Sequence, residues 1–210
     1  MPSNALMSAY AFYDARALDG SGKQLGYHSY GACVAEVLID AITGAPPTLH
    51  HVHASQNSPT GDRRVLRVDL LFDCGKPLNP AVDVGQCEGA FVQGLGLVLQ
   101  EEVTFDPTTG ANHSTSTWEY KIPSAACIPR VFHVSLLPES AHPAGVLSSK
   151  AMGEPPLLLS ASVMCAVRRA VDAARKQLGR GAAGAELALP FGPREVAAGV
   201  GGVDVAAAVY

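Results

Sequence analysis

The sequence is poor in charged residues and has no hydrophobic run long enough to cross a membrane. Charged residues make up 16% of the chain and hydrophobic residues 48%, so we expect much of it to be buried. The net charge of −4 argues against nucleic acid as the main partner. The N-terminus has no basic region followed by an apolar core, so we expect neither a secretory signal nor a membrane partner.

Paired cysteine motifs are also absent. No cysteine belongs to a C-x-x-C pair, which disfavours a zinc ribbon and an iron–sulfur site within these residues. An odd, dispersed set of thiols is typical of reduced core residues in a reducing compartment, so we expect a cytoplasmic protein. The five cysteines are Cys33, Cys74, Cys87, Cys127 and Cys165.

Several common catalytic motifs are missing. The chain has no G-x-S-x-G elbow, no H-E-x-x-H and no dinucleotide fingerprint after a strand, which disfavours ordinary hydrolases, zincins and Rossmann enzymes. Histidines cluster only at His50, His51 and His53, within a Pro-, Ser- and His-rich segment over residues 45–61. No carboxylate or cysteine accompanies them, so we favour an exposed loop over a metal site.

Three strands are indicated by alternating or β-branched residues, at residues 30–40, 65–73 and 131–137. The first two are expected to pair as a hairpin. Two long helices are also indicated, so the pattern predicts an α+β fold in which mixed or antiparallel strands pack against two long helices.

The first long helix is expected over residues 80–102, with Asn79 as its cap and Pro80 in its first position. Its glycines are unusual, because each costs about 1 kcal/mol relative to Ala in a helix interior. Two explanations stay open: tight packing, with Gln86 satisfied by the backbone, or close approach of a bulky ligand. The glycines are Gly85, Gly89, Gly94 and Gly96.

The second long helix follows Glu154, which lies between Gly153 and the pair Pro155–Pro156. The prolines fit a first helical turn, and the helix is expected to stop before Gly179. A glutamate here can complement the helix dipole, or it can be a rigidly held general base. The local pattern by itself favours the first of these roles.

Three segments, taken together, resemble one family. They are residues 73–96 (DCGKPLNPAVDVGQCEGAFVQGLG), 116–123 (STWEYKIP) and 146–159 (VLSSKAMGEPPLLL). In this order they are similar to the C-terminal part of the molybdenum-binding region of the xanthine dehydrogenase/aldehyde oxidase family. The residues of these segments most resemble those of aldehyde oxidases from plants and green algae, and they resemble those of xanthine dehydrogenase almost as much. The resemblance implies the second molybdopterin-binding subdomain of these enzymes, over about residues 27–180.

The resemblance implies hydroxylation of an aldehyde or azaheterocycle with oxygen derived from water. Glu154 matches the family's catalytic base and Gln86 matches the glutamine beside the molybdenum centre, which takes no direct protein ligand here. Gly85, Gly89 and Gly153 are expected to line the molybdenum–molybdopterin cofactor. Lys150 is expected either to bind backbone carbonyls or to neutralise a charge. The length of the matching segments disfavours an unrelated α+β binding module.

Residues 27–180 then form the subdomain, 1–26 a poorly determined N-terminal segment and 181–210 a Gly/Ala-rich tail. The family's glycine-rich pterin loop, substrate-facing arginine, flavin domain and iron–sulfur domains are not found in this sequence. The resemblance therefore implies that the chain is a fragment or a subunit of a split enzyme. Its partners would be the remaining parts, which carry FAD and 2Fe–2S clusters and form a homodimer. A xanthine dehydrogenase fragment and a non-catalytic remnant that binds no cofactor are the alternatives. The substrate and the electron acceptor depend on residues outside this sequence.

Overall fold

The computed structural model describes residues 27–39, 64–143, 145–180 and 187–201. The histidine cluster at residues 50–53, the loop over residues 45–61 and the N-terminal segment over residues 1–26 lie outside these ranges. No helix among the described residues is long and apolar enough to cross a membrane.

A three-stranded sheet forms the centre of the molecule, with strand order β1-β2-β3. Strand β1 (Gly31–Leu38) pairs antiparallel with β2 (Arg64–Phe72), as the sequence predicts. Strand β3 (Val131–Leu136) pairs parallel with β2, because the chain crosses over through a helix before it returns to the sheet. The sheet is therefore mixed, and the predicted α+β class is confirmed.

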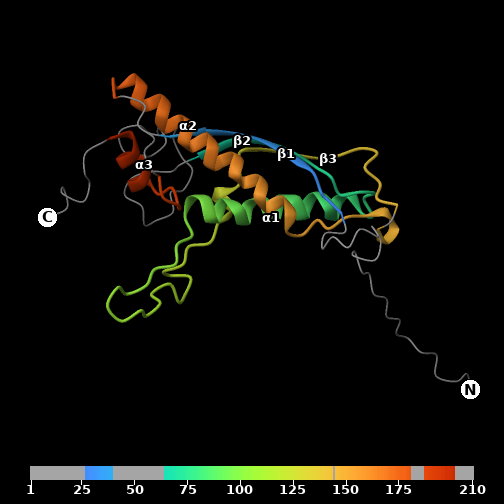
Figure 1. Cartoon of the computed structure of the whole chain (residues 1–210), viewed down its shortest axis with the longest axis horizontal. Coiled ribbons are helices and arrows are strands. Elements are labelled where there is room, and N and C mark those ends of the chain that lie inside the picture. The colour runs from blue at the N-terminus through green and yellow to red at the C-terminus, as the bar shows by residue number, and fades with distance from the viewer. Residues whose placement is uncertain (1–26, 40–63, 144, 181–186, 202–210) are drawn as a thin grey trace, which may run out of the picture.

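Helices α1 (Pro80–Leu99) and α2 (Ala161–Gln177) cover one face of this sheet and cross each other above it (Figure 1). The inward-facing residues of β2 alternate with outward ones, as expected for a strand with one buried face. Helix α2 contributes a stripe at helical spacing. The core formed in this way includes Val68, Leu70, Phe72, Phe91, Leu95, Val163, Val167 and Val171.

Helix α1 begins at Pro80, as predicted, but Asn79 does not cap it with its side chain. The extended Asn79 residue instead accepts the Asp83 N–H at its backbone carbonyl, at 3.0 Å. The helix ends at Leu99 rather than at residue 102, because the N–H groups of Gln100 and Glu101 both turn back to the Gly96 carbonyl.

The segment after Glu154 is not a single helix. A 3₁₀ helix, η4 (Pro155–Ser160), comes first, with the two prolines in its first turn as predicted. Helix α2 starts only at Ala161 and ends before Gly179, whose φ of +66° supplies the predicted stop.

Two further parts complete the described chain. Residues 101–123 extend away from the helices, and Phe105 and Asn112 form an isolated bridge within this arm (Figure 1). Helix α3 (Pro193–Val200) packs against α2 and buries Val196 and Val200 completely. The Gly/Ala-rich C-terminal region therefore includes a packed helix.

We predict that Gly94→Ala and Gly89→Ala have opposite effects on stability. A Cβ atom at Gly94 would lie 2.7 Å from the Leu157 carbonyl oxygen and 2.6 Å from the Ser160 Cβ, whereas one at Gly89 would meet nothing within 4 Å. Overpacking should lower the free energy of unfolding of Gly94→Ala by about 1–3 kcal/mol. Gly89→Ala should raise it by roughly 0.5–1 kcal/mol, because Ala is the better helix former. Urea unfolding of both variants measures the difference, and equal effects would contradict the packing described.

Candidate functional site

One face of helix α1 is left open by the rest of the described chain. Val82, Gly85, Gln86, Gly89 and Gln93 recur at helical spacing, and all five are exposed. A Cβ atom added at Gly85 or Gly89 would meet nothing within 4 Å. The bare backbone at these two glycines therefore leaves room for a bulky group to lie against the helix.

The other two glycines of α1 have a different reason. A Cβ atom at Gly94 would collide with η4, and one at Gly96 would lie 2.9 Å from Pro123. Tight packing thus accounts for Gly94 and Gly96 only. Close approach of a bulky ligand, the second explanation left open by the sequence, stays a prediction for Gly85 and Gly89.

Gln86 meets Gly153 on this open face, although the two residues are far apart in the sequence. The Gln86 Oε1 atom lies 3.4 Å from the position that a Cβ on Gly153 would occupy. No described residue forms a hydrogen bond with the Gln86 amide. The interpretation in which the backbone satisfies this amide is therefore wrong for the described part of the chain. The amide keeps both its donor and its acceptor available.

Glu154 follows Gly153 and is exposed. It occupies the position before η4, but its side chain does not cap the helix. Its backbone carbonyl accepts the Leu157 N–H at 3.0 Å, so the backbone is fixed while the carboxylate is not engaged. Within the described ranges no residue forms a hydrogen bond or ion pair with that carboxylate. The side chain therefore forms no capping hydrogen bond at this position.

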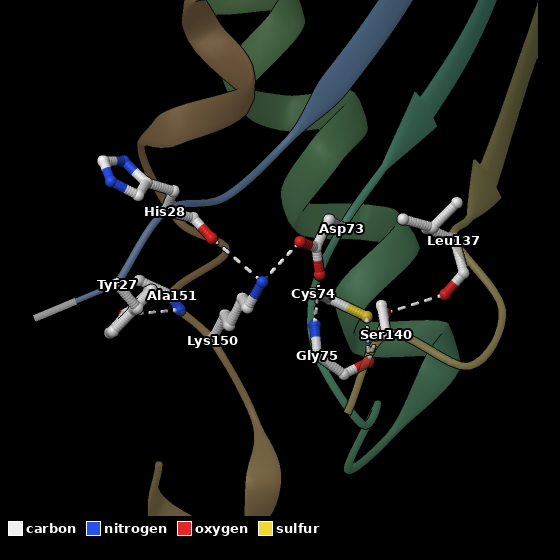
Figure 2. Close-up of polar contacts among 9 residues, drawn as sticks. All are labelled: Tyr27, His28, Asp73, Cys74, Gly75, Leu137, Ser140, Lys150 and Ala151. Atoms are coloured by element: carbon white, nitrogen blue, oxygen red, sulfur yellow. Dashed lines mark hydrogen bonds and ion pairs between the residues drawn. The ribbon is translucent and has the colours of Figure 1, made fainter. Parts of the chain in front are cut away.

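A buried ion pair holds the chain just before this corner. The Lys150 ammonium contacts the Asp73 carboxylate and donates a hydrogen bond to the His28 carbonyl at 2.9 Å (Figure 2). The side chains are only 10% and 2% exposed, respectively. Lys150 thus performs both roles that its sequence context suggested: it binds a carbonyl and it neutralises a charge.

Burial tends to raise the pKa of the Asp73 carboxyl, but its hydrogen bonds have the larger combined effect. Lys150 and the Gly75 N–H, at 3.0 Å, both donate to the carboxylate and favour its ionised form. The pKa of Asp73 is therefore lowered below its ordinary value of 3.8. The Asp73 carboxylate therefore stays ionised at neutral pH.

Sequence reasoning missed Asp73 as a residue of this site. In the sequence it is only the first residue of a matching segment, and nothing near it shows that its partner is Lys150. A signal was present: a carboxylate at the end of an alternating strand, directly before a glycine turn, lies where the strand leaves the core.

The cysteines behave as core residues where they are close to the site. Cys74 and Cys87 are almost completely buried. Burial raises the pKa of the Cys87 thiol to about 12, so this thiol stays protonated at neutral pH.

Comparison with known proteins identifies the family. Residues 48–129 match the family model of a molybdopterin cofactor-binding domain. The chain is 51% identical over 152 residues to an indole-3-acetaldehyde oxidase of Arabidopsis thaliana, and the match covers 72% of this chain and 10% of that protein. It is 47% identical over 150 residues to the abscisic-aldehyde oxidase of the same plant, with 71% and 10% covered. The chain belongs to the aldehyde oxidase/xanthine dehydrogenase family.

The fold of this chain is similar to part of a solved oxidoreductase structure. The crystal structure of quinoline 2-oxidoreductase from Pseudomonas putida 86 superposes with a TM-score of 0.56 at 27% sequence identity. The match covers 68% of this chain and 17% of that one. The chain spans about a tenth of the length of the plant oxidases that it matches.

The residues of the open face fit the cofactor of this family. The backbone at Gly85 and Gly89 lies bare, and the Gln86 amide can both donate and accept a hydrogen bond. The described residues include no group of three or more His, Cys, Asp and Glu that could hold a metal ion. A metal at this surface would thus take its ligands from an organic cofactor or from other segments.

We predict that acid weakens the contribution of Asp73 to stability. Because its folded pKa lies below 3.8, the stabilisation is complete above about pH 4 and is lost as the pH falls through the folded value. At neutral pH, Asp73→Asn leaves the Lys150 charge uncompensated and should cost about 3–5 kcal/mol. The difference in free energy of unfolding between wild type and variant should shrink below about pH 4, as urea unfolding at several pH values can measure.

Asp69 supplies the control for this prediction, since it lies on the same strand and pairs with Arg67 on the exposed face. Asp69→Asn should change stability far less, because solvent screens exposed pairs. A similar loss in both variants would contradict the importance of burial.

Proposed function

We propose that this chain is part of a molybdenum hydroxylase that oxidises aldehydes to carboxylic acids with oxygen derived from water, and that Glu154 is its general base. One observation carries the proposal: the exposed, unengaged Glu154 carboxylate directly follows Gly153, where an added Cβ atom would lie 3.4 Å from Gln86 Oε1 on the open face of α1. A general base must be ionised and must have its oxygen within reach of the proton it removes. The Glu154 carboxylate is exposed and forms no hydrogen bond or ion pair with a described residue, so its oxygens are free to accept that proton.

Each site residue has a role in this proposal. The molybdenum–molybdopterin cofactor, when bound, supplies oxygen transfer and accepts the electrons of the oxidation. Gly85, Gly89 and Gly153 give it a surface without side chains, and Gln86 orients oxygen atoms at that surface through its amide. Glu154 takes the proton of the water-derived nucleophile. Closure of the face by other segments would exclude bulk water and strengthen these polar contacts.

Aldehydes are the favoured substrates because the plant relatives with about half of their matched residues identical are named as aldehyde oxidases. A second candidate is hydroxylation of an azaheterocycle, as in a xanthine dehydrogenase. The structural relative named as a quinoline 2-oxidoreductase supports it, at 27% identity. Parallel assays with an aromatic aldehyde and with an azaheterocycle separate the two, since the true substrate class should have the higher kcat/KM.

The remaining expectations concern the complete protein. We propose that residues 27–180 are the molybdopterin-binding subdomain within a cytoplasmic homodimer. FAD and 2Fe–2S clusters would lie in other parts of that protein and carry electrons away from the cofactor. In this proposal these parts also supply the residues that select the substrate.

Replacement of the base tests the function. Glu154→Gln keeps the shape of the side chain and removes its ability to take a proton. In the complete cofactor-loaded protein, kcat should fall by about 100-fold to 10,000-fold. Steady-state turnover and molybdenum content by elemental analysis measure the effect, and the molybdenum content should stay unchanged.

Glu102→Gln is the matched control, because Glu102 is exposed on the arm after α1, away from Gly153. This variant should turn over at the wild-type rate. Near-normal activity of Glu154→Gln would reject the assignment of the base. A wild-type protein that retains no molybdenum would instead favour the non-catalytic remnant.

Gly89→Ala tests the cofactor surface separately from the base. The new methyl group points into the space that we assign to the cofactor, so molybdenum content should fall although the chain itself becomes slightly more stable. Elemental analysis and urea unfolding on the same preparation measure both quantities. Full molybdenum content in this variant would exclude close approach of the cofactor at Gly89.

A further inference from the structure

The ion pair of Asp73 and Lys150 joins the end of β2 to the segment that leads to Glu154 (Figure 2). Taking two charges out of water is expensive, so a buried pair is a poor way to gain stability alone. Such a pair can instead fix the relative position of two segments, because its carboxylate and ammonium must lie within hydrogen-bond distance of each other and of further partners. Each charge has one further hydrogen bond of this kind: Lys150 donates to the His28 carbonyl, and Asp73 accepts the Gly75 N–H.

Backbone strain occurs immediately before Lys150. Leu147 and Ser148 have φ values of +51° and +63°, in the left-handed region that side chains disfavour. Leu147 is 70% exposed, so burial of its side chain does not compensate for this conformation. Hydrogen bonds from the Lys76 N–H at 2.8 Å and the His142 N–H at 3.0 Å hold the Ser148 carbonyl in place. Strain that the surroundings over-determine is typical of functional sites.

The segment from Lys150 to Gly153 is held by hydrogen bonds and by burial. The Lys150 N–H donates to the Cys74 carbonyl at 2.8 Å, and the Ala151 N–H donates to the Tyr27 hydroxyl at 3.0 Å. Met152 is buried in the core, and Gly153 lies against Gln86. Backbone hydrogen bonds at Lys150 and Ala151 and the burial of Met152 therefore restrain the chain between the ion pair and Gly153.

Helix α1 is attached to the other side of the same pair. Asp73 is followed by the turn at Gly75 and then by Asn79 and α1, which carries Gln86. The pair thus lies between the two backbone paths that lead to Glu154 and to Gln86. A shift at the pair would change the separation of these two side chains without touching either of them.

We propose that Asp73 and Lys150 are positioning residues that set the placement of Glu154 relative to Gln86. This rests on the proposed function, in which Glu154 removes a proton and Gln86 orients oxygen atoms. Neither member of the pair reaches the open face, so the pair acts through the backbone. Misplacement of a reacting group by about 1 Å can lower a rate about a hundredfold.

Lys150→Met removes the charge and keeps the length of the side chain. In the complete cofactor-loaded protein, kcat should fall by about a hundredfold while KM and molybdenum content change little. Amide hydrogen exchange should become faster at position 150 and at Leu157, whose backbone N–H groups bond to the carbonyls of Cys74 and Glu154. Lys176→Met is the matched control, since Lys176 is exposed at the end of α2, and should change neither kcat nor exchange.

The double variant Asp73→Asn/Lys150→Met covers the case in which Lys150→Met fails to fold. It leaves no unpaired buried charge, so it should fold and still show the lower kcat and the faster exchange. If amide exchange at position 150 and at Leu157 in the double variant equals that in Lys176→Met, the positioning role is overturned, whatever the kcat. So would a normal kcat in the double variant.

Glu154→Gln, measured in parallel, distinguishes failure of this inference from failure of the proposed function. If Glu154→Gln is inactive and the double variant shows normal kcat and exchange, only the positioning role is wrong. If Glu154→Gln is active, the function of Glu154 is wrong, and the positioning role falls with it even where exchange is faster. Loss of kcat in both, with faster exchange in the double variant alone, supports the inference.

Discussion

The contact between the Lys150 ammonium and the Asp73 carboxylate is the constraint on which the arrangement of the site depends. It is almost completely buried, and it joins two stretches of chain that are distant in sequence. One of them leads from β2 into α1, and the other leads into η4 and α2. Because the Lys150 ammonium also donates to the His28 carbonyl and the Asp73 carboxylate also accepts the Gly75 N–H, the two stretches are held in one relative placement. Gln86 and Glu154 lie within the same frame for this reason.

Helix α1 serves two purposes along its length. At its C-terminal end, Gly94 and Gly96 let the helix approach η4 and the following loop more closely than any side chain would permit. At its N-terminal end, Gly85 and Gly89 face open space. Glycine weakens a helix locally. Close packing offsets this cost at Gly94 and Gly96, whereas Gly85 and Gly89 leave a surface without side chains. Such a surface suits a family whose plant members are about ten times longer than the matched region.

Much of the fold could be predicted from local patterns, and the exceptions have physical causes. Alternation predicted β1 and β2 as a hairpin, and helical spacing predicted α1 and α2, since these periods follow from the backbone itself. The parallel pairing of β3 could not be read in this way, because it depends on the path of the chain through α1 and the arm. The 3₁₀ stretch after Glu154 was also missed, because two prolines in the first turn fit both kinds of helix. The sequence also predicted Asn79 as the cap of α1, but its side chain forms no capping hydrogen bond.

The sequence by itself determined the family, through three long segments whose order and wording are specific, and with it the candidate roles of Glu154 and Gln86. It also determined which stretches are strands and helices, because periodicity is a property of neighbouring residues. Only the tertiary structure decided that Gln86 lies against Gly153, that Glu154 is exposed and caps nothing, and that Asp73 is the partner of Lys150. Contacts between distant residues depend on how the helices pack across the sheet, and no local pattern carries that information.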